Sequence, residues 1–90
     1  MGYEDADSVG IGRLVTGWRK RAFLSQTALA DALGTQQATV SKLETGSYKL
    51  SVRQLACILN ACGLSFADVA DELDATLHME ARPIWERVHE

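Results

Sequence analysis

Residues 36–44 combine side chains that suit hydrogen bonding to base pairs. Glutamine can pair bidentately with adenine, and lysine can donate to the acceptor atoms of guanine. A helix over this segment would turn outward compact polar side chains and one cation, namely Gln36, Gln37, Thr39, Ser41 and Lys42. A solvated helix face more often carries glutamate and lysine pairs, whereas no acid occurs here before Glu44. The pattern favours contact with the major groove of DNA over a merely solvated polar surface.

The rest of the chain offers little for catalysis or metal binding. We find no nucleophile beside a base, no paired catalytic carboxylates and no phosphate-binding loop. The histidines and cysteines lack metal-ligand spacing: His78, His89, Cys57 and Cys62. Residues five apart lie on different faces of a helix, so we expect no disulfide and two buried, apolar cysteines. The sequence therefore predicts no enzyme, no metal site and no cofactor.

Charge is distributed unevenly along the chain. The net charge is −3, which by itself argues against nucleic acid as a partner. Residues 13–53, however, carry seven cations and two acids, whereas both flanking segments are acidic. Because the field at a phosphate depends on charges within about 10 Å, the basic middle keeps DNA binding open.

Five helices are predicted from apolar periodicity and from residues that begin or end helices. They cover residues 11–22, 26–33, 36–44, 52–62 and a last stretch that Ser65 opens and that ends near Leu77. In the first helix, apolar residues recur at i, i+3, i+4, i+7 and i+11, the spacing of one helix face. Either Thr35 or Gln36 caps the third helix. We therefore expect an all-α domain in residues 11–77, an acidic tail in residues 1–10 and a C-terminal extension in residues 78–90.

The second and third predicted helices are joined by a tight turn at Gly34. Glycine suits this position because it adopts positive φ without strain. A short, rigid connection of this kind holds the second helix of a helix-turn-helix so that it can enter a groove about 12 Å wide. Ala30 is small where the two helices must approach closely. Four apolar residues point to a shared core: Leu29, Leu33, Val40 and Leu43.

With these residues in place, the sequence resembles the XRE (Cro/CI, lambda-repressor-like) family over about residues 11–70. The matching positions are Ser25-Gln26, Leu29-Ala30, Leu33-Gly34, Val40-Ser41-Lys42-Leu43-Glu44, Gly46, Ser51, Leu55 and Ala61-Cys62-Gly63-Leu64-Ser65. The resemblance implies a compact five-helix, lambda-repressor-like helix-turn-helix domain.

The resemblance also implies roles for individual residues. Gln36 and Gln37 would touch bases, Thr39 would face the backbone or a thymine methyl, and Lys42 would reach a base or a phosphate. Gln26 would bind a phosphate at a helix N-terminus. Further phosphate contacts are expected from Arg19, Lys20, Ser47, Tyr48 and Lys49. Arg19 and Glu44 occupy positions that the family often joins in a partly buried ion pair.

The sequence departs from the family pattern at Phe23, Thr35 and Leu50. The family usually has glycine where Phe23 stands, and phenylalanine with positive φ would be strained. We therefore expect the turn between the first two helices to differ from the family's.

The C-terminal extension is the candidate dimerisation element. Pro83 breaks the pattern, and the residues after it fit either a strand or one helical turn. Trp85 can pack on its own domain or anchor a dimer, because tryptophan is a frequent hot-spot residue. We expect dimerisation through Ile84, Trp85 and Val88.

We thus predict a homodimeric transcriptional regulator, acting as a repressor, that reads a palindromic double-stranded DNA operator. An antitoxin that represses its own operon and binds a toxin is an alternative. A protein-interaction module that has lost DNA binding is another. The acidic N-terminus is unlike a signal peptide, and no apolar run approaches the roughly 20 residues of a membrane span, so we expect a cytoplasmic protein without membrane contact.

Overall fold

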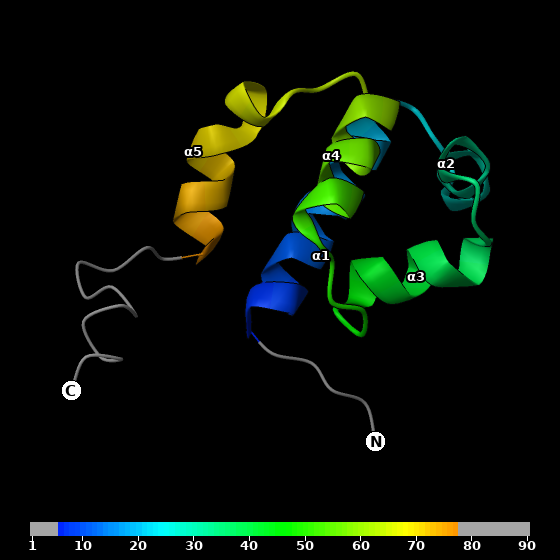
Figure 1. Ribbon diagram of the computed structural model, residues 1–90, viewed down its shortest axis with the longest axis horizontal. Helices are drawn as coiled ribbons and strands as arrows, with labels where there is room; N and C mark the ends of the chain where they lie inside the picture. Colours follow the sequence, from blue (N-terminus) through cyan, green and yellow to red (C-terminus); the bar gives the residue numbers. More distant parts are fainter. Residues whose placement is uncertain (1–5, 78–90) are drawn as a thin grey trace.

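Five helices occupy residues 6–77, the part of the chain that the computed structural model describes (Figure 1). They are α1 (Ala6–Arg21), α2 (Gln26–Leu33), α3 (Gln37–Thr45), α4 (Val52–Ala61) and α5 (Phe66–Leu77). This order confirms the predicted all-α, five-helix fold. Within these residues, no helix is both long and apolar enough to cross a membrane.

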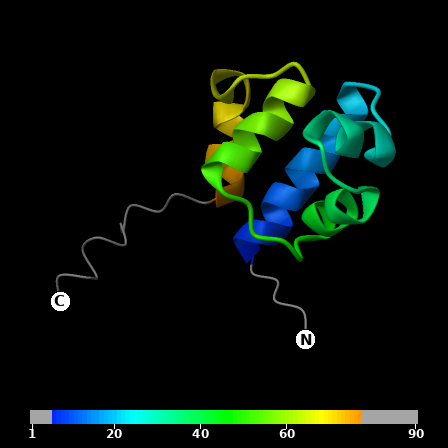
Figure 2. The ribbon, with the colours of Figure 1, turned by 45° about the vertical axis from the view of Figure 1, so that its right-hand side comes forward.

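Helix α1 begins five residues earlier than predicted. Residues 6–10, expected to belong to an acidic tail, form its first turns. Glycine weakens a helix in isolation, but packing overrides that preference here. A Cβ added to Gly12 would lie 2.5 Å from the carbonyl oxygen of Leu43, so α1 and α3 touch along their backbones. Figure 2 shows the loop after α3 passing the start of α1, where a Cβ on Gly46 would lie 2.8 Å from the Cα of Val9.

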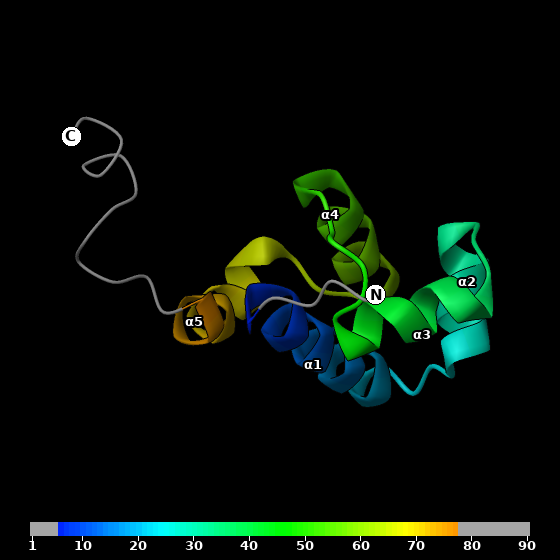
Figure 3. The ribbon, with the colours of Figure 1, turned by 90° about the horizontal axis from the view of Figure 1, so that it is seen from below.

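The core lies where α1 packs against α3 and α5, and α2 packs against α3 and α4. Seen from below, α3 lies between α1 and α2, and α5 lies on the other side of α1 (Figure 3). The buried side chains come from all five helices: Val15, Trp18, Leu29, Ala30, Val40, Leu43, Ile58, Leu59 and Val69. Trp18 is fully buried, and its Nε1 donates to Glu72 Oε1 at 2.8 Å. This bond satisfies the indole N–H and ties α1 to α5.

Polar side chains cap the starts of the helices. Ser25 caps α2 by accepting from the backbone N–H of Ala28. Ser65 and Asp68 exchange the two hydrogen bonds of a capping box at α5. Gln36, rather than Thr35, is the N-cap of α3, although its side chain makes no capping bond.

The turn after α1 corrects the expectation made for Phe23. Phe23 adopts φ of 61° and takes the left-handed position that glycine usually fills. The N–H of Leu24 donates to the carbonyl of Arg19, and the N–H of Phe23 donates to that of Lys20. These two bonds form a Schellman turn. Leu24 packs against the core, so burial of the next residue holds Phe23 in its unfavourable conformation.

Helix α4 corrects a second expectation, that both cysteines are buried. Leu55, Ile58 and Leu59 turn toward the core, whereas Cys57 lies on the outer side of the helix and is exposed. Cys62 is half-buried, and both thiols are free. Burial of the Cys62 thiol raises its pKa.

Candidate nucleic-acid interface

Helices α2 and α3 form the predicted helix-turn-helix pair. Gly34 ends α2 with φ of 72°, and the N–H of Thr35 donates to the carbonyl of Ala30 at 2.9 Å. Ala30 is buried, as expected for the residue at the close contact between the helices, and Val40 is buried on the facing helix. The turn and this contact fix the direction in which α3 projects.

The outer face of α3 carries no unpaired acid. Gln36 at the N-cap, Gln37 and Lys42 are exposed. Thr39 and Ser41, which were expected to point outward, are both half-buried. The difference arises because α3 begins at Gln37 and packs against both α1 and α2, which leaves a narrower exposed stripe.

Two exposed residues of α3, Ala38 and Thr45, were missed in the sequence. They lie four residues before and three residues after Lys42, so all three share one helix face. Polar residue types alone do not indicate alanine, although its methyl group suits contact with the methyl of thymine. The spacing 38, 42 and 45 was the signal that could have revealed this face.

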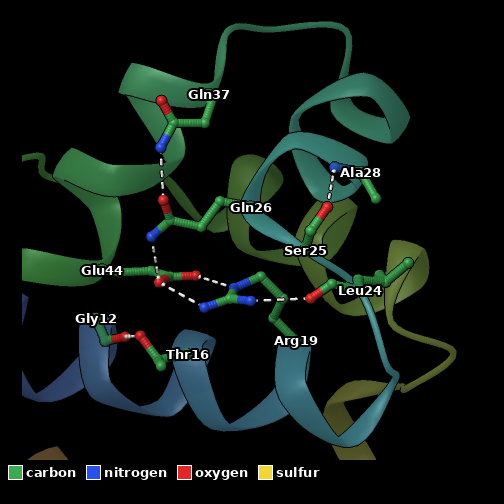
Figure 4. A network of polar contacts seen from close by, with 9 residues as sticks. All are labelled: Gly12, Thr16, Arg19, Leu24, Ser25, Gln26, Ala28, Gln37 and Glu44. Atoms are coloured by element: carbon green, nitrogen blue, oxygen red, sulfur yellow. Dashed lines mark hydrogen bonds and ion pairs between the residues drawn. The ribbon is translucent and has the colours of Figure 1, made fainter.

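A chain of polar contacts runs from α1 through α2 to the head of α3 (Figure 4). Arg19 Nε donates to Glu44 Oε2 at 2.6 Å, and Arg19 Nη2 donates to Glu44 Oε1 at 3.2 Å. Gln26 Nε2 also donates to Glu44 Oε1, at 2.9 Å, while Gln26 Oε1 accepts from Gln37 Nε2 at 2.6 Å. The amides of Gln26 and Gln37 are therefore oriented by bonds that start at an ion pair.

Arg19 and Glu44 keep each other charged, although both are largely buried. The side chains of Arg19 and Glu44 are only 11% and 6% exposed. Burial alone would raise the pKa of Glu44, but hydrogen bonds from Arg19 and Gln26 outweigh it and hold that pKa below its ordinary value. The bond to Glu44 likewise raises the pKa of Arg19 against the effect of burial. Glu44 is thus an inward-facing carboxylate and adds no free acid to the outer face of α3.

The residues expected to contact phosphate differ in how far they are exposed. Arg19 also donates from Nη1 to the carbonyl of Leu24 at 2.9 Å, so its guanidinium is held inside the protein and positions other groups. Lys20 is exposed in the last turn of α1. Ser47 and Lys49 are exposed in the loop after α3, while Tyr48 is half-buried and its hydroxyl accepts from Gln54 Nε2 at 3.0 Å.

The residues expected to form a dimer contact, Ile84, Trp85 and Val88, lie outside the described part of the chain.

Among the cations of the basic middle, Arg21 pairs with Glu72 on α5 at 3.3 Å. Its side chain is therefore turned away from α3.

Comparison with known proteins gives one family match and several structural matches. The family model for a helix-turn-helix domain matches residues 11–73. A comparison with curated proteins finds no match.

Among solved structures, the chain is similar to the clp gene regulator ClgR from C. glutamicum, with 26% identity and a TM-score of 0.72 over 84% of this chain and 97% of that one. It is also similar to the restriction-modification controller protein C.AhdI from Aeromonas hydrophila, with 26% identity and a TM-score of 0.65 over 77% of this chain and 98% of that one. A third similarity, to hydroxypropylphosphonic acid epoxidase from S. wedmorenis, has 29% identity and a TM-score of 0.65. It covers 71% of this chain but only 34% of the epoxidase, so the likeness is to a part of that enzyme.

Proposed function

Because the chain belongs to the helix-turn-helix domain family, we propose that it is a sequence-specific transcriptional regulator, acting as a repressor, that binds double-stranded DNA. It reads the major groove with α3 as a homodimer. Two similar structures, each matched over nearly its whole chain, are named as a gene regulator and a controller protein, which supports a regulatory role.

The observation that carries the proposal is the outer face of α3. Its exposed residues are two amides, a cation, a methyl group and a hydroxyl, while the one acid of the helix is turned inward to Arg19. An acid on this face would repel phosphates, whereas these groups match the donors, acceptors and methyl groups of base edges. Gln37 and Lys42 are the residues we expect to discriminate most strongly between bases.

The start of α2 supplies the backbone contact. Gln26 is the first residue of α2, where unpaired N–H groups and the helix dipole favour a phosphate. Its side-chain amide is already oriented by Glu44. Rigid placement of this kind reduces the entropy lost on binding. Lys20 and the loop of Ser47, Tyr48 and Lys49 would add charge and hydrogen bonds along the DNA backbone.

A homodimer explains how so small a domain could bind specifically. Single modules of this size bind weakly, and a two-fold dimer places two recognition helices on half-sites about 34 Å apart. The operator would then be palindromic. We assign the dimer contact to residues 78–90, with Ile84, Trp85 and Val88 as its apolar side chains.

The test is selection from a pool of random duplexes at two salt concentrations, followed by sequencing of the bound fraction. We expect enrichment of one palindrome and binding that weakens steeply as salt rises, because phosphate contacts release counterions. Binding without an enriched sequence would leave only a nonspecific DNA binder. Folded protein that binds no duplex would overturn the proposal and favour a protein-interaction module.

A further inference from the structure

An open apolar groove of about 430 Å³ lies beside the C-terminal end of α3. The start of α1, the loop after α3, the start of α4 and the end of α5 line it. Its apolar side chains are Ile11, Leu43, Leu50, Val52, Leu55 and Leu77. Val52 is 76% exposed, although it stands among partly buried neighbours that pack on the core. A partner that covers this apolar side chain would therefore bind favourably.

Few large hydrophobic side chains are fully exposed on the described part of the chain. Among residues 6–77, the exposed large hydrophobic residues are Phe23, Val52 and Phe66, which belong to three different parts of the fold. A stable dimer buries on the order of 1,000 Å² or more. Phe23, Val52 and Phe66 do not form one patch, so apolar side chains beyond the described residues would add to the area of such an interface.

The chain outside the described residues starts at the groove itself. Leu77 is the last residue of α5 and lines the groove. Thirteen residues follow, and their large apolar members include Ile84, Trp85 and Val88. Eight residues of extended chain span at most about 29 Å, which is enough for Trp85 to reach a neighbouring copy.

We infer that the groove of each copy binds the apolar side chains of residues 84–88 from a second copy. The inference rests on the proposed homodimer and names its docking site. Because the segment leaves the domain at the edge where the groove opens, two copies related by a two-fold axis can exchange segments in both directions. Each contact is then made twice, as an isologous interface requires.

Binding of the segment in the groove would also stabilise the DNA-binding surface. Leu43, which belongs to α3, forms part of the groove, and so do Tyr48 and Lys49 from the loop that we assign to phosphate contact. A partner segment packed against these residues would hold α3 and the loop together. Dimerisation and DNA binding would therefore strengthen each other.

The exchange can be tested by mixing two full-length variants, each defective in one half of the contact. Val52→Glu places a charge in the groove but keeps Trp85. Glutamate is tolerated at the first position of a helix, and the exposure of Val52 leaves the core unchanged. Trp85→Ala removes the inserted side chain but keeps the groove. Arg53→Glu is the matched control, since Arg53 is exposed on the same turn and does not line the groove.

The first readout is the quenching of Trp85 fluorescence by iodide, obtained by subtracting the signal of the Trp85→Ala variant. The second is the mass of the particle measured by sedimentation. We expect Trp85 to be shielded in the natural chain and in Arg53→Glu, and quenched in Val52→Glu alone. Mixing Val52→Glu with Trp85→Ala should shield Trp85 again and produce heterodimers, because one intact groove then meets one intact segment. If circular dichroism shows Val52→Glu unfolded, Val52→Ser replaces it.

Three results would overturn the inference. Trp85 shielded in a monomer, without rescue by mixing, would show that the segment binds its own domain. If Trp85 is shielded in Val52→Glu alone, it binds somewhere other than the groove. If iodide quenches Trp85 in the natural chain, the segment does not dock at all. No DNA is present, so failure here is distinct from failure to bind an operator.

Discussion

Replacing Phe23 by glycine should stabilise the domain, although the change removes an aromatic ring. Phe23 adopts φ of 61°, and it is 95% exposed. The left-handed conformation costs a residue with a Cβ about 1–2 kcal/mol. Glycine avoids that cost, but the greater conformational freedom of its unfolded chain lowers the stability by about 0.5–1 kcal/mol. Because the ring buries almost no area, we expect a net gain of about 0.5–1 kcal/mol.

Urea unfolding followed by circular dichroism measures this gain. For a domain of this size it corresponds to an increase in Tm of roughly 2–8 °C. Phe23→Ala is the control, because alanine removes the ring but keeps the Cβ that causes the strain, and its stability should stay within about 0.5 kcal/mol of the natural chain. Equal midpoints for Phe23→Gly and Phe23→Ala would refute the argument from strain.

Three further predictions concern the contacts around α3. Gly12→Ala should destabilise the domain by about 2 kcal/mol or more, since its methyl group would meet the carbonyl oxygen of Leu43 at 2.5 Å. Gly17→Ala is the control, because a Cβ there has nothing within 4 Å, and it should not lower the free energy of unfolding in the same urea assay. Glu44→Gln should cost about 2 kcal/mol at neutral pH. The low pKa of Glu44 in the folded protein makes this cost shrink as pH falls below the ordinary value of 4.5, which unfolding of both proteins across a pH series would reveal. In a double-mutant cycle for affinity to the selected duplex, Gln26→Ala and Gln37→Ala should couple by about 0.5–1.5 kcal/mol, and additive losses would show that their hydrogen bond is not used in the complex.

The helices and the turn between α2 and α3 could be predicted because the signals for them are local. Ser25, Gly34 and Ser65 mark helix ends through bonds to atoms a few residues away. The apolar spacing then states which face each helix buries. The same reasoning indicated the exposed amide of Gln37 and the exposed cation of Lys42.

The errors arose where distant packing outweighs local preference. The acidic N-terminus predicted a tail in residues 1–10, but α1 begins at Ala6, and its glycines permit close contact with α3 and α5. Phe23 predicted an altered turn, but burial of Leu24 keeps the left-handed geometry. The exposure of Cys57 depends on where α4 packs, which a short apolar run does not state.

The candidate site was only partly visible in the sequence for a similar reason. Polar residue types indicated Gln37 and Lys42, but Thr39 and Ser41 are half-buried because α3 is held by two helices at once. The network that links Arg19, Glu44 and Gln26 joins residues 18 to 25 positions apart. The family resemblance implied the ion pair of Arg19 and Glu44, but only the packed structure shows that Gln26 joins it to Gln37.

The affinity of Lys42→Gln for the selected duplex tests most directly whether α3 reads DNA. Arg21→Gln is the matched control, because it also removes one cation but from a side chain turned toward α5. We expect Lys42→Gln to lose about 1–3 kcal/mol of binding free energy, or roughly 5- to 150-fold in Kd, and to relax the preference for one base. Arg21→Gln should bind nearly as the natural chain does. Equal affinity and unchanged base preference in a folded Lys42→Gln would contradict recognition through α3.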